Sequence, residues 1–133
     1  MGDVGQFLSS EWLRELGDVA AGSIALREVA DGVSLAVHHR VTGGPNGDVE
    51  YHVRIGDGAV LVEPGAGPEP ADVDVRMAYA TAVAINRGEV APSQAFAAGL
   101  VRLGGRPGVL AQHREALARL DDVFGELRAR TTY

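Results

Sequence analysis

The sequence of 133 residues contains no cysteine and no lysine, and only 5% of its residues are aromatic. Without cysteine, the chain forms no disulfide, holds no zinc through thiolates and has no cysteine nucleophile. No apolar run approaches the roughly 20 residues that a membrane-spanning helix needs, and the first ten residues lack the basic and apolar segments of a signal peptide. These absences predict a cytoplasmic protein that does not insert stably into a membrane.

Acidic residues outnumber basic residues by 18 to 12, which gives a formal net charge of −6. Binding to nucleic acid usually requires a basic patch, so the sequence predicts no nucleic-acid partner. Hydrophobic residues make up 46% of the chain and charged residues 23%, a balance that is typical of a globular domain. Because no linker or internal repeat divides the chain, we expect a single domain over residues 1–133.

The most informative stretch is residues 71–109, where the spacing of apolar residues changes several times. Residues 72–77 alternate between apolar and charged, which predicts a half-buried strand. Residues 79–87 have helical spacing and are followed by a glycine, which favours the end of a helix. A proline-started short helix over residues 92–99 and a strand over residues 100–103 follow.

The rest of the chain shows similar patterns. Alternation of apolar and polar residues predicts three further strands, over residues 33–42, 49–55 and 59–63, so the sheet has five strands. Helical spacing predicts a first helix that starts at Ser9 or Ser10 and ends at Gly22. It also predicts one continuous last helix over residues 108–130, and we expect this helix to fray or bend at Gly125, since glycine is a poor helix former.

Short motifs between residues 87 and 105 carry a resemblance to a known family. They are Arg87-Gly88-Glu89 at a helix end, Pro92 at a helix start, Ala95-Phe96 shortly before Gly99, and Gly105 before the last helix. With these motifs the chain resembles the sterol carrier protein 2 family of small lipid-transfer domains, in its free-standing bacterial form. Two positions depart from the family pattern: Ala78 stands where a Ser or Thr cap is usual, and Arg106 stands where an acid is usual.

The resemblance implies an α+β fold. In that fold a five-stranded, mixed and mainly antiparallel sheet is covered on one face by helices, and an apolar cavity lies between the sheet and the helices. The implied function is that of a non-catalytic carrier, without a cofactor, for a fatty acid, an acyl-CoA, a sterol or a similar elongated apolar ligand. An interaction or accessory module with a closed cavity is the alternative.

The ligand is expected to touch the apolar residues at odd positions of the strands and the inner faces of the helices. The expected ligand-binding residues are Leu35, Val37, Tyr51, Val53, Val75, Met77, Val83, Phe96, Leu100, Val101, Leu103, Leu117, Leu120 and Phe124. Among these, Phe96 is expected to be buried and to line one side of the cavity. Phe124 and Leu127 extend the apolar stripe of the last helix, which predicts either a lid over the cavity or a contact in a homodimer.

The histidines are the remaining candidates for chemistry. His38 and His52 are expected to lie opposite each other on the polar face of a hairpin, but two ligands are too few for a zinc site. A solvated polar face is the alternative to an acid–base role for this pair, and a position in the core or at its rim is the alternative for His113. No serine lies in a nucleophile-elbow motif. The sequence therefore predicts no catalytic or metal-binding residue, and a small acid–base enzyme remains the less favoured hypothesis.

Overall fold

The computed structural model describes residues 6–45, 47–65, 67, 71–106, 108–128, 131 and 133, without the side chains of Ala30, Asp121 and Phe124. Its strands are β1 (Ser34–Gly44), β2 (Gly47–Gly56), β3 (Ala59–Pro64), β4 (Val73–Ala78) and β5 (Val101–Gly105). Its helices are α1 (Ser10–Gly22), α2 (Ile24–Ala30), α3 (Tyr79–Asn86), α4 (Pro92–Ala97), α5 (Gly108–Gln112) and α6 (Arg114–Arg128). None of the helices in the described residues is long and apolar enough to cross a membrane.

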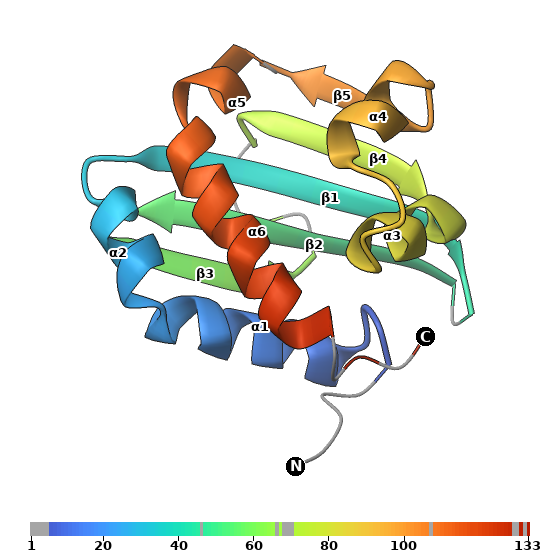
Figure 1. Ribbon diagram of the computed structural model, residues 1–133, viewed down its shortest axis with the longest axis horizontal. Coiled ribbons are helices and arrows are strands. Elements are labelled where there is room, and N and C mark those ends of the chain that lie inside the picture. Colours follow the sequence, from blue (N-terminus) through green and yellow to red (C-terminus); the bar gives the residue numbers. More distant parts are fainter. Residues whose placement is uncertain are drawn as a thin grey trace.

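The strands form one sheet in the order β3-β2-β1-β4-β5 (Figure 1). Neighbouring strands are antiparallel except β1 and β4, which are parallel. Helices α3 to α6 lie over one face of the sheet, and α1 runs along β3 at one edge (Figure 1). The prediction of a mixed, mainly antiparallel sheet with helices on one face is therefore confirmed.

The strand register brings the apolar residues of β1, β2 and β4 to the helix-covered face. Val37 lies opposite Val53 in β2 and opposite Val73 in β4, and all three side chains are buried. The helices contribute large side chains to the same core, which are fully buried at Trp12, Leu16, Leu26 and Leu127. The alternation seen in the sequence thus divides the sheet into an apolar face and a polar face.

Asp72 ties the start of the parallel strand pair together. Its amide donates to the Ala36 carbonyl at 2.8 Å, and its carboxylate accepts from the Ala36 amide at 2.9 Å and from the Arg106 guanidinium at 2.5 Å. The Ala36 amide and the Arg106 side chain hold the pKa of Asp72 below its usual value. Arg106 therefore has an acidic partner that offsets its unfavourable position near a helix start.

Gly105 is the neighbour of Arg106, and its backbone explains why glycine is required there. It has a φ of +74°, and a Cβ atom at this position would lie 2.6 Å from the Asp72 carbonyl oxygen. Any other residue would push β5 away from the Asp72 backbone.

Several predictions about the helices are confirmed. α1 starts at Ser10, and the Ser9 hydroxyl accepts a hydrogen bond from the Trp12 amide as its cap. α3 has no side-chain cap at Ala78, as its sequence indicates. No pattern in the sequence predicted α2, which is only seven residues long and is capped by the Ser23 hydroxyl. A helix of this length spans about two turns, too few to establish a period from sequence.

The prediction of one continuous last helix that bends at Gly125 is wrong. The helix is interrupted at His113, whose amide is shared between the carbonyls of Val109 and Leu110 at 3.2 and 3.3 Å. α6 then continues through Gly125 to Arg128. Packing of its buried side chains outweighs the cost of one glycine, which is about 1 kcal/mol.

The end of α6 belongs to the core of the chain. Leu127 has no exposed surface. Its carbonyl accepts a hydrogen bond from the Thr131 hydroxyl, and this hydroxyl accepts one from the Trp12 indole. Leu127 therefore packs inside its own chain instead of covering a cavity mouth or a partner subunit, whereas the side chain of Phe124 lies outside the described residues.

This position of Leu127 predicts a large effect of truncating it. Leu127→Ala should lower the free energy of unfolding by about 2–5 kcal/mol, since it leaves a cavity in the core. Leu61→Ala is the matched control, because Leu61 is 52% exposed and its truncation should change stability by about 0.5 kcal/mol or less. Urea denaturation of both variants measures the difference, and equal stabilities would show that the end of α6 is not core.

Candidate functional site

Apolar side chains on the helix-covered face differ in how completely they are buried. On β1 and β2, Leu35 and Val53 are closed off from solvent, with exposed fractions of 2% and 1%. On β4 and β5 the paired residues Val75 and Leu103 are only half-buried, as is Met77. Apolar surface therefore stays accessible on a face that the helices cover.

We call this accessible surface the half-buried apolar cluster. Its members lie on β4, α3, β5 and α6, and all of them pack against the main core: Val75, Met77, Val83, Leu103 and Leu117. All five belong to the residues that the sequence analysis expected to bind a ligand. Part of the surface of these five side chains therefore stays accessible beside the core.

The other expected ligand-binding residues divide into three groups. Buried in the core are Leu35, Val37, Tyr51, Val53, Val101 and Leu120. Phe96 and Leu100 lie on the surface, each 52% exposed. The side chain of Phe124 is outside the described residues.

The expectation that Phe96 is buried is wrong. α4 is a six-residue helix that buries only Ala95. Successive residues of a helix point about 100° apart, so a helix that buries one small side chain turns the next residue, Phe96, outward. Truncation of Phe96 therefore costs less than the 3–5 kcal/mol typical of a buried phenylalanine.

His39 lies among apolar residues on the helix-covered face, opposite Tyr51 in β2 and Val75 in β4. The rings of His39 and Tyr51 are stacked, with 4.6 Å between their centroids and 2° between their planes. Burial, together with the nearby His38, lowers the pKa of His39 to about 4, and burial raises the pKa of Tyr51. Both side chains are therefore uncharged near neutral pH.

His39 is not among the site residues predicted from the sequence. The available signal was its position, because the alternation that puts Val37 and Val41 in the core also puts His39 there. A histidine at an apolar position of a strand is a departure from the pattern, and such departures are expected where a structure serves a function.

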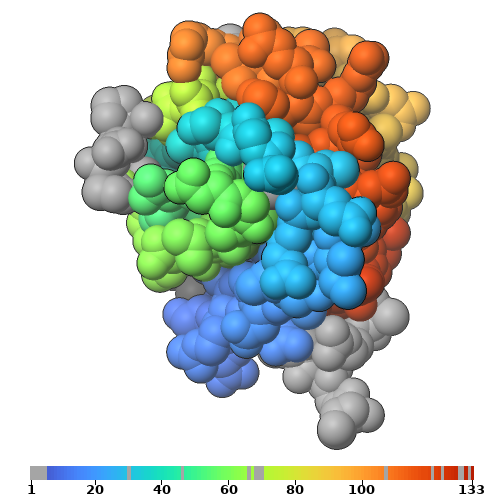
Figure 2. Space-filling model, turned by 90° about the vertical axis from the view of Figure 1, so that its left-hand side faces the viewer, coloured from blue at the N-terminus to red at the C-terminus, as the bar shows by residue number. Residues whose placement is uncertain are grey.

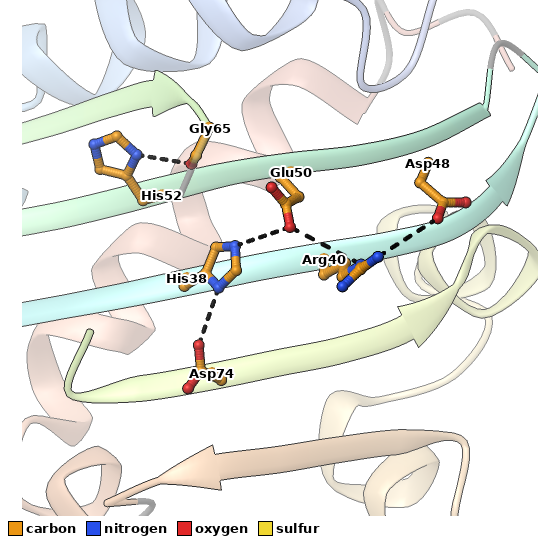
Figure 3. A network of polar contacts seen from close by, with 7 residues as sticks. All are labelled: His38, Arg40, Asp48, Glu50, His52, Gly65 and Asp74. Carbon is orange, nitrogen blue, oxygen red and sulfur yellow. Dashed lines mark hydrogen bonds and ion pairs between the residues drawn. The ribbon is translucent and has the colours of Figure 1, made fainter. Parts of the chain in front are cut away.

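On the opposite, polar face, His38 connects three strands (Figure 3). Its Nδ1 donates to the Asp74 carboxylate in β4 at 3.0 Å, and its Nε2 lies 3.7 Å from Glu50 in β2. Glu50 also faces Arg40, at 3.9 Å. Because the Nε2 atom of His38 is buried, this ring presents no accessible nitrogen to a substrate.

His52 lies next to His38 across the two strands, as predicted. Its Nδ1 donates to the Gly65 carbonyl at 2.9 Å (Figure 3). Gly67 also lies close to the ring. The ring is only 5% exposed, so the interpretation of a solvated pair is wrong for His52. Gly65 and Gly67 lie against the ring, and both histidines serve to join backbone and strands on the polar face.

A surface hollow lies where α2 meets the turn between β2 and β3, at the end of the molecule that Figure 2 shows. It is lined by Ile24, Arg27, Glu28, Asp31 and Gly58, none of which is an expected ligand-binding residue. Among the described residues, no group of three or more histidine and acidic side chains is arranged to hold a metal ion. His113 is half-buried at the junction of α5 and α6.

Residues 21–119 match the model of the SCP-2 sterol transfer family. The match spans most of the chain. The chain belongs to the SCP-2 sterol transfer family. The resemblance that the motifs around Pro92 indicated is therefore confirmed, and no curated protein matches the chain.

Solved structures of SCP-2 proteins share this fold. A crystal structure of sterol carrier protein 2 is 22% identical, with a TM-score of 0.75 over 91% of this chain and 98% of that chain. A conserved hypothetical protein from Thermus thermophilus, described as possibly a sterol carrier protein, is 21% identical, with a TM-score of 0.74 over 96% and 92%. Apo sterol carrier protein 2 from Yarrowia lipolytica is 14% identical, with a TM-score of 0.64 over 95% and 94%.

The low pKa of His39 predicts a loss of stability in acid for this SCP-2 family member. Below about pH 6.5 the unfolded chain binds a proton at His39, whereas the folded chain excludes it until about pH 4. The contribution of His39 to the free energy of unfolding is therefore fully present above pH 6.5 and falls as the pH drops towards 4. Between pH 7 and pH 4.5 the expected loss is roughly 2–3 kcal/mol, at 1.36 kcal/mol per pKa unit.

His39→Phe provides the comparison, since it keeps a ring to stack on Tyr51 and removes the titration. Urea denaturation at pH 7 and pH 4.5 should show a smaller loss of stability in the variant, by roughly the same 2–3 kcal/mol. Contributions from the carboxylates are common to both proteins and cancel in this difference. An equal loss in the two proteins would mean that His39 titrates normally.

Proposed function

We propose that the protein is a non-catalytic carrier that holds an elongated apolar ligand, such as a fatty acid, an acyl-CoA or a sterol, between the sheet and the helices. The observation that carries the proposal is the half-buried apolar cluster, because these side chains keep accessible surface on the covered face of the sheet. Membership of the SCP-2 sterol transfer family supports the same ligand class.

Burial of the ligand's apolar surface is sufficient to drive binding. Each buried methylene contributes about 0.8 kcal/mol, so roughly ten methylenes contribute about 8 kcal/mol before the entropy lost on binding is counted. Phe96 and Leu100 lie on α4 and just before β5, close to the cluster in sequence, and their exposed side chains offer further apolar contacts. No cofactor or covalent step is needed for this function.

The polar face supports a carrier better than an enzyme. The most enzyme-like arrangement there is the contact of Asp74 with His38, which orients a ring as in an acid–base catalyst. Its other nitrogen is buried and faces Glu50, and His52 donates to backbone. A general base must reach the proton that it abstracts, so this arrangement supports a role in stability.

Val75 and Arg76 provide a matched pair of positions to test the proposal, because they are consecutive in β4 and point to opposite faces. Val75→Phe fills the space beside the half-buried cluster and should weaken binding of a fluorescent fatty acid at least tenfold. Arg76→Phe adds a ring at an exposed position and should leave binding unchanged. A fluorescence titration of the two variants and the parent protein measures the affinities.

The stability of Val75→Phe provides the second measurement. If space is present next to Val75, the variant should unfold at nearly the same urea concentration as the parent protein. Overpacking of a filled core would instead cost about 1–3 kcal/mol. A strongly destabilised Val75→Phe protein, or equal affinities of Val75→Phe and the parent protein for the fatty acid, would contradict the proposed function.

A further inference from the structure

The stacked pair of His39 and Tyr51 introduces two polar groups into the apolar face of the sheet. Tyr51 is 5% exposed and His39 is half-buried. Within the described part of the chain, neither the imidazole nitrogens of His39 nor the Tyr51 hydroxyl makes a hydrogen bond or an ion pair. The strand register puts His39 directly beside Val75, a member of the half-buried apolar cluster.

Such an arrangement is unusual next to apolar surface. The fully buried polar side-chain atoms without a partner in the described part of the chain belong to His38, His52, Tyr79 and Asn86, so the polar atoms of His39 and Tyr51 remain accessible to water. The Trp12 indole, in contrast, donates to Thr131 at 2.9 Å. A ligand that covers His39 and Tyr51 displaces this water, and it loses affinity unless it replaces the hydrogen bonds. Two adjacent accessible polar groups next to accessible apolar surface therefore favour a ligand with a matching polar group.

We propose that His39 and Tyr51 bind an uncharged hydroxyl group of the lipid that lies against the half-buried apolar cluster. This inference rests on the proposed carrier function and adds to it a polar subsite and a ligand class, namely lipids that carry an alcohol. The apolar part of the ligand extends from this subsite along Val75 and Leu103.

The chemistry of the pair matches an alcohol. A neutral imidazole has one N–H donor and one acceptor nitrogen, and a tyrosine hydroxyl also donates and accepts. An alcohol hydroxyl also donates and accepts hydrogen bonds, so it can pair with both His39 and Tyr51. A carboxylate accepts hydrogen bonds but brings a charge, and an unpaired charge is costly in an apolar surrounding.

The distribution of arginines argues further against a carboxylate. The strand arginines occupy even positions: Arg40, Arg54, Arg76 and Arg102. They point to the face opposite His39, since β1 and β2 put odd positions on the helix-covered side and the pairing of β4 and β5 continues this parity. Among the described strand residues, no cation lies on the side where a carboxylate would need one.

Tyr51→Phe is the most conservative test, because it removes only the hydroxyl and retains the stacked ring. The probes are hexadecanol, hexadecane and palmitic acid, each used to displace an apolar fluorescent dye. The ratio of the hexadecanol and hexadecane affinities isolates the hydroxyl contribution, and comparison of this ratio between proteins cancels the different solubilities of the probes. Tyr51→Phe and His39→Phe should each lower the ratio about tenfold.

Tyr79→Phe is the matched control. The Tyr79 hydroxyl likewise has no hydrogen-bond partner among the described residues, but it is fully buried, and its ring packs near Phe7 and Gly44, away from the stacked pair. This variant should leave the hexadecanol preference unchanged. If His39→Phe does not fold, Tyr51→Phe alone decides the result.

The possible outcomes separate this inference from the carrier function. Unchanged ratios in both variants of the pair, with the parent protein still binding the probes, would overturn the hydroxyl subsite and leave the carrier function standing. A loss confined to palmitic acid would overturn the choice of an uncharged hydroxyl. A parent protein that binds none of the three probes would contradict the carrier function itself.

Discussion

The parallel pairing of β1 with β4 is the constraint on which the rest of the structure depends. The two strands are separated in the chain by β2 and β3, and Asp72 secures their alignment through hydrogen bonds to both backbone groups of Ala36. This register puts Val73, Val75 and Met77 on the same face as the apolar residues of β1. It also adds the β4–β5 pair to the first three strands, so that the apolar face is wide enough to carry both a closed core and accessible surface.

The two faces of the sheet have different consequences for function. On the polar face, His38 links β1 to Asp74 in β4, and His52 donates to the Gly65 carbonyl just after β3. These polar side chains therefore contribute to stability. On the other face, β1, β2 and the helices α1, α2 and α6 contribute most of the buried core side chains. The helices over β4 and β5 are short and rich in alanine, and small side chains leave more of the strand surface accessible. A carrier needs this combination, because a rigid core must hold a surface that stays unfilled.

Local patterns predicted much of the fold, and contacts between distant segments account for what they missed. Alternation located the strands and paired His38 with His52, because a hairpin register depends on neighbouring residues. The contact of His38 with Asp74 joins residues 36 positions apart and requires the parallel register, which no local pattern encodes. The same reason explains Phe96: helical spacing indicated the helix but not which side of so short a helix meets the sheet. His39 was visible in the pattern, but its significance depends on Tyr51 and Val75, which the fold brings to it.

The most direct test of this account is the location of a bound lipid, measured by nuclear magnetic resonance of the methyl groups. On titration with palmitic acid or hexadecanol, the methyl signals of Val75, Met77, Val83 and Leu103 should shift together and saturate at one ligand per chain. Leu61 and Ile24, which are exposed outside the cluster, should not move. Shifts confined to these exposed residues, or no shifts at any lipid concentration, would contradict the claim that the protein holds its ligand between the sheet and the helices.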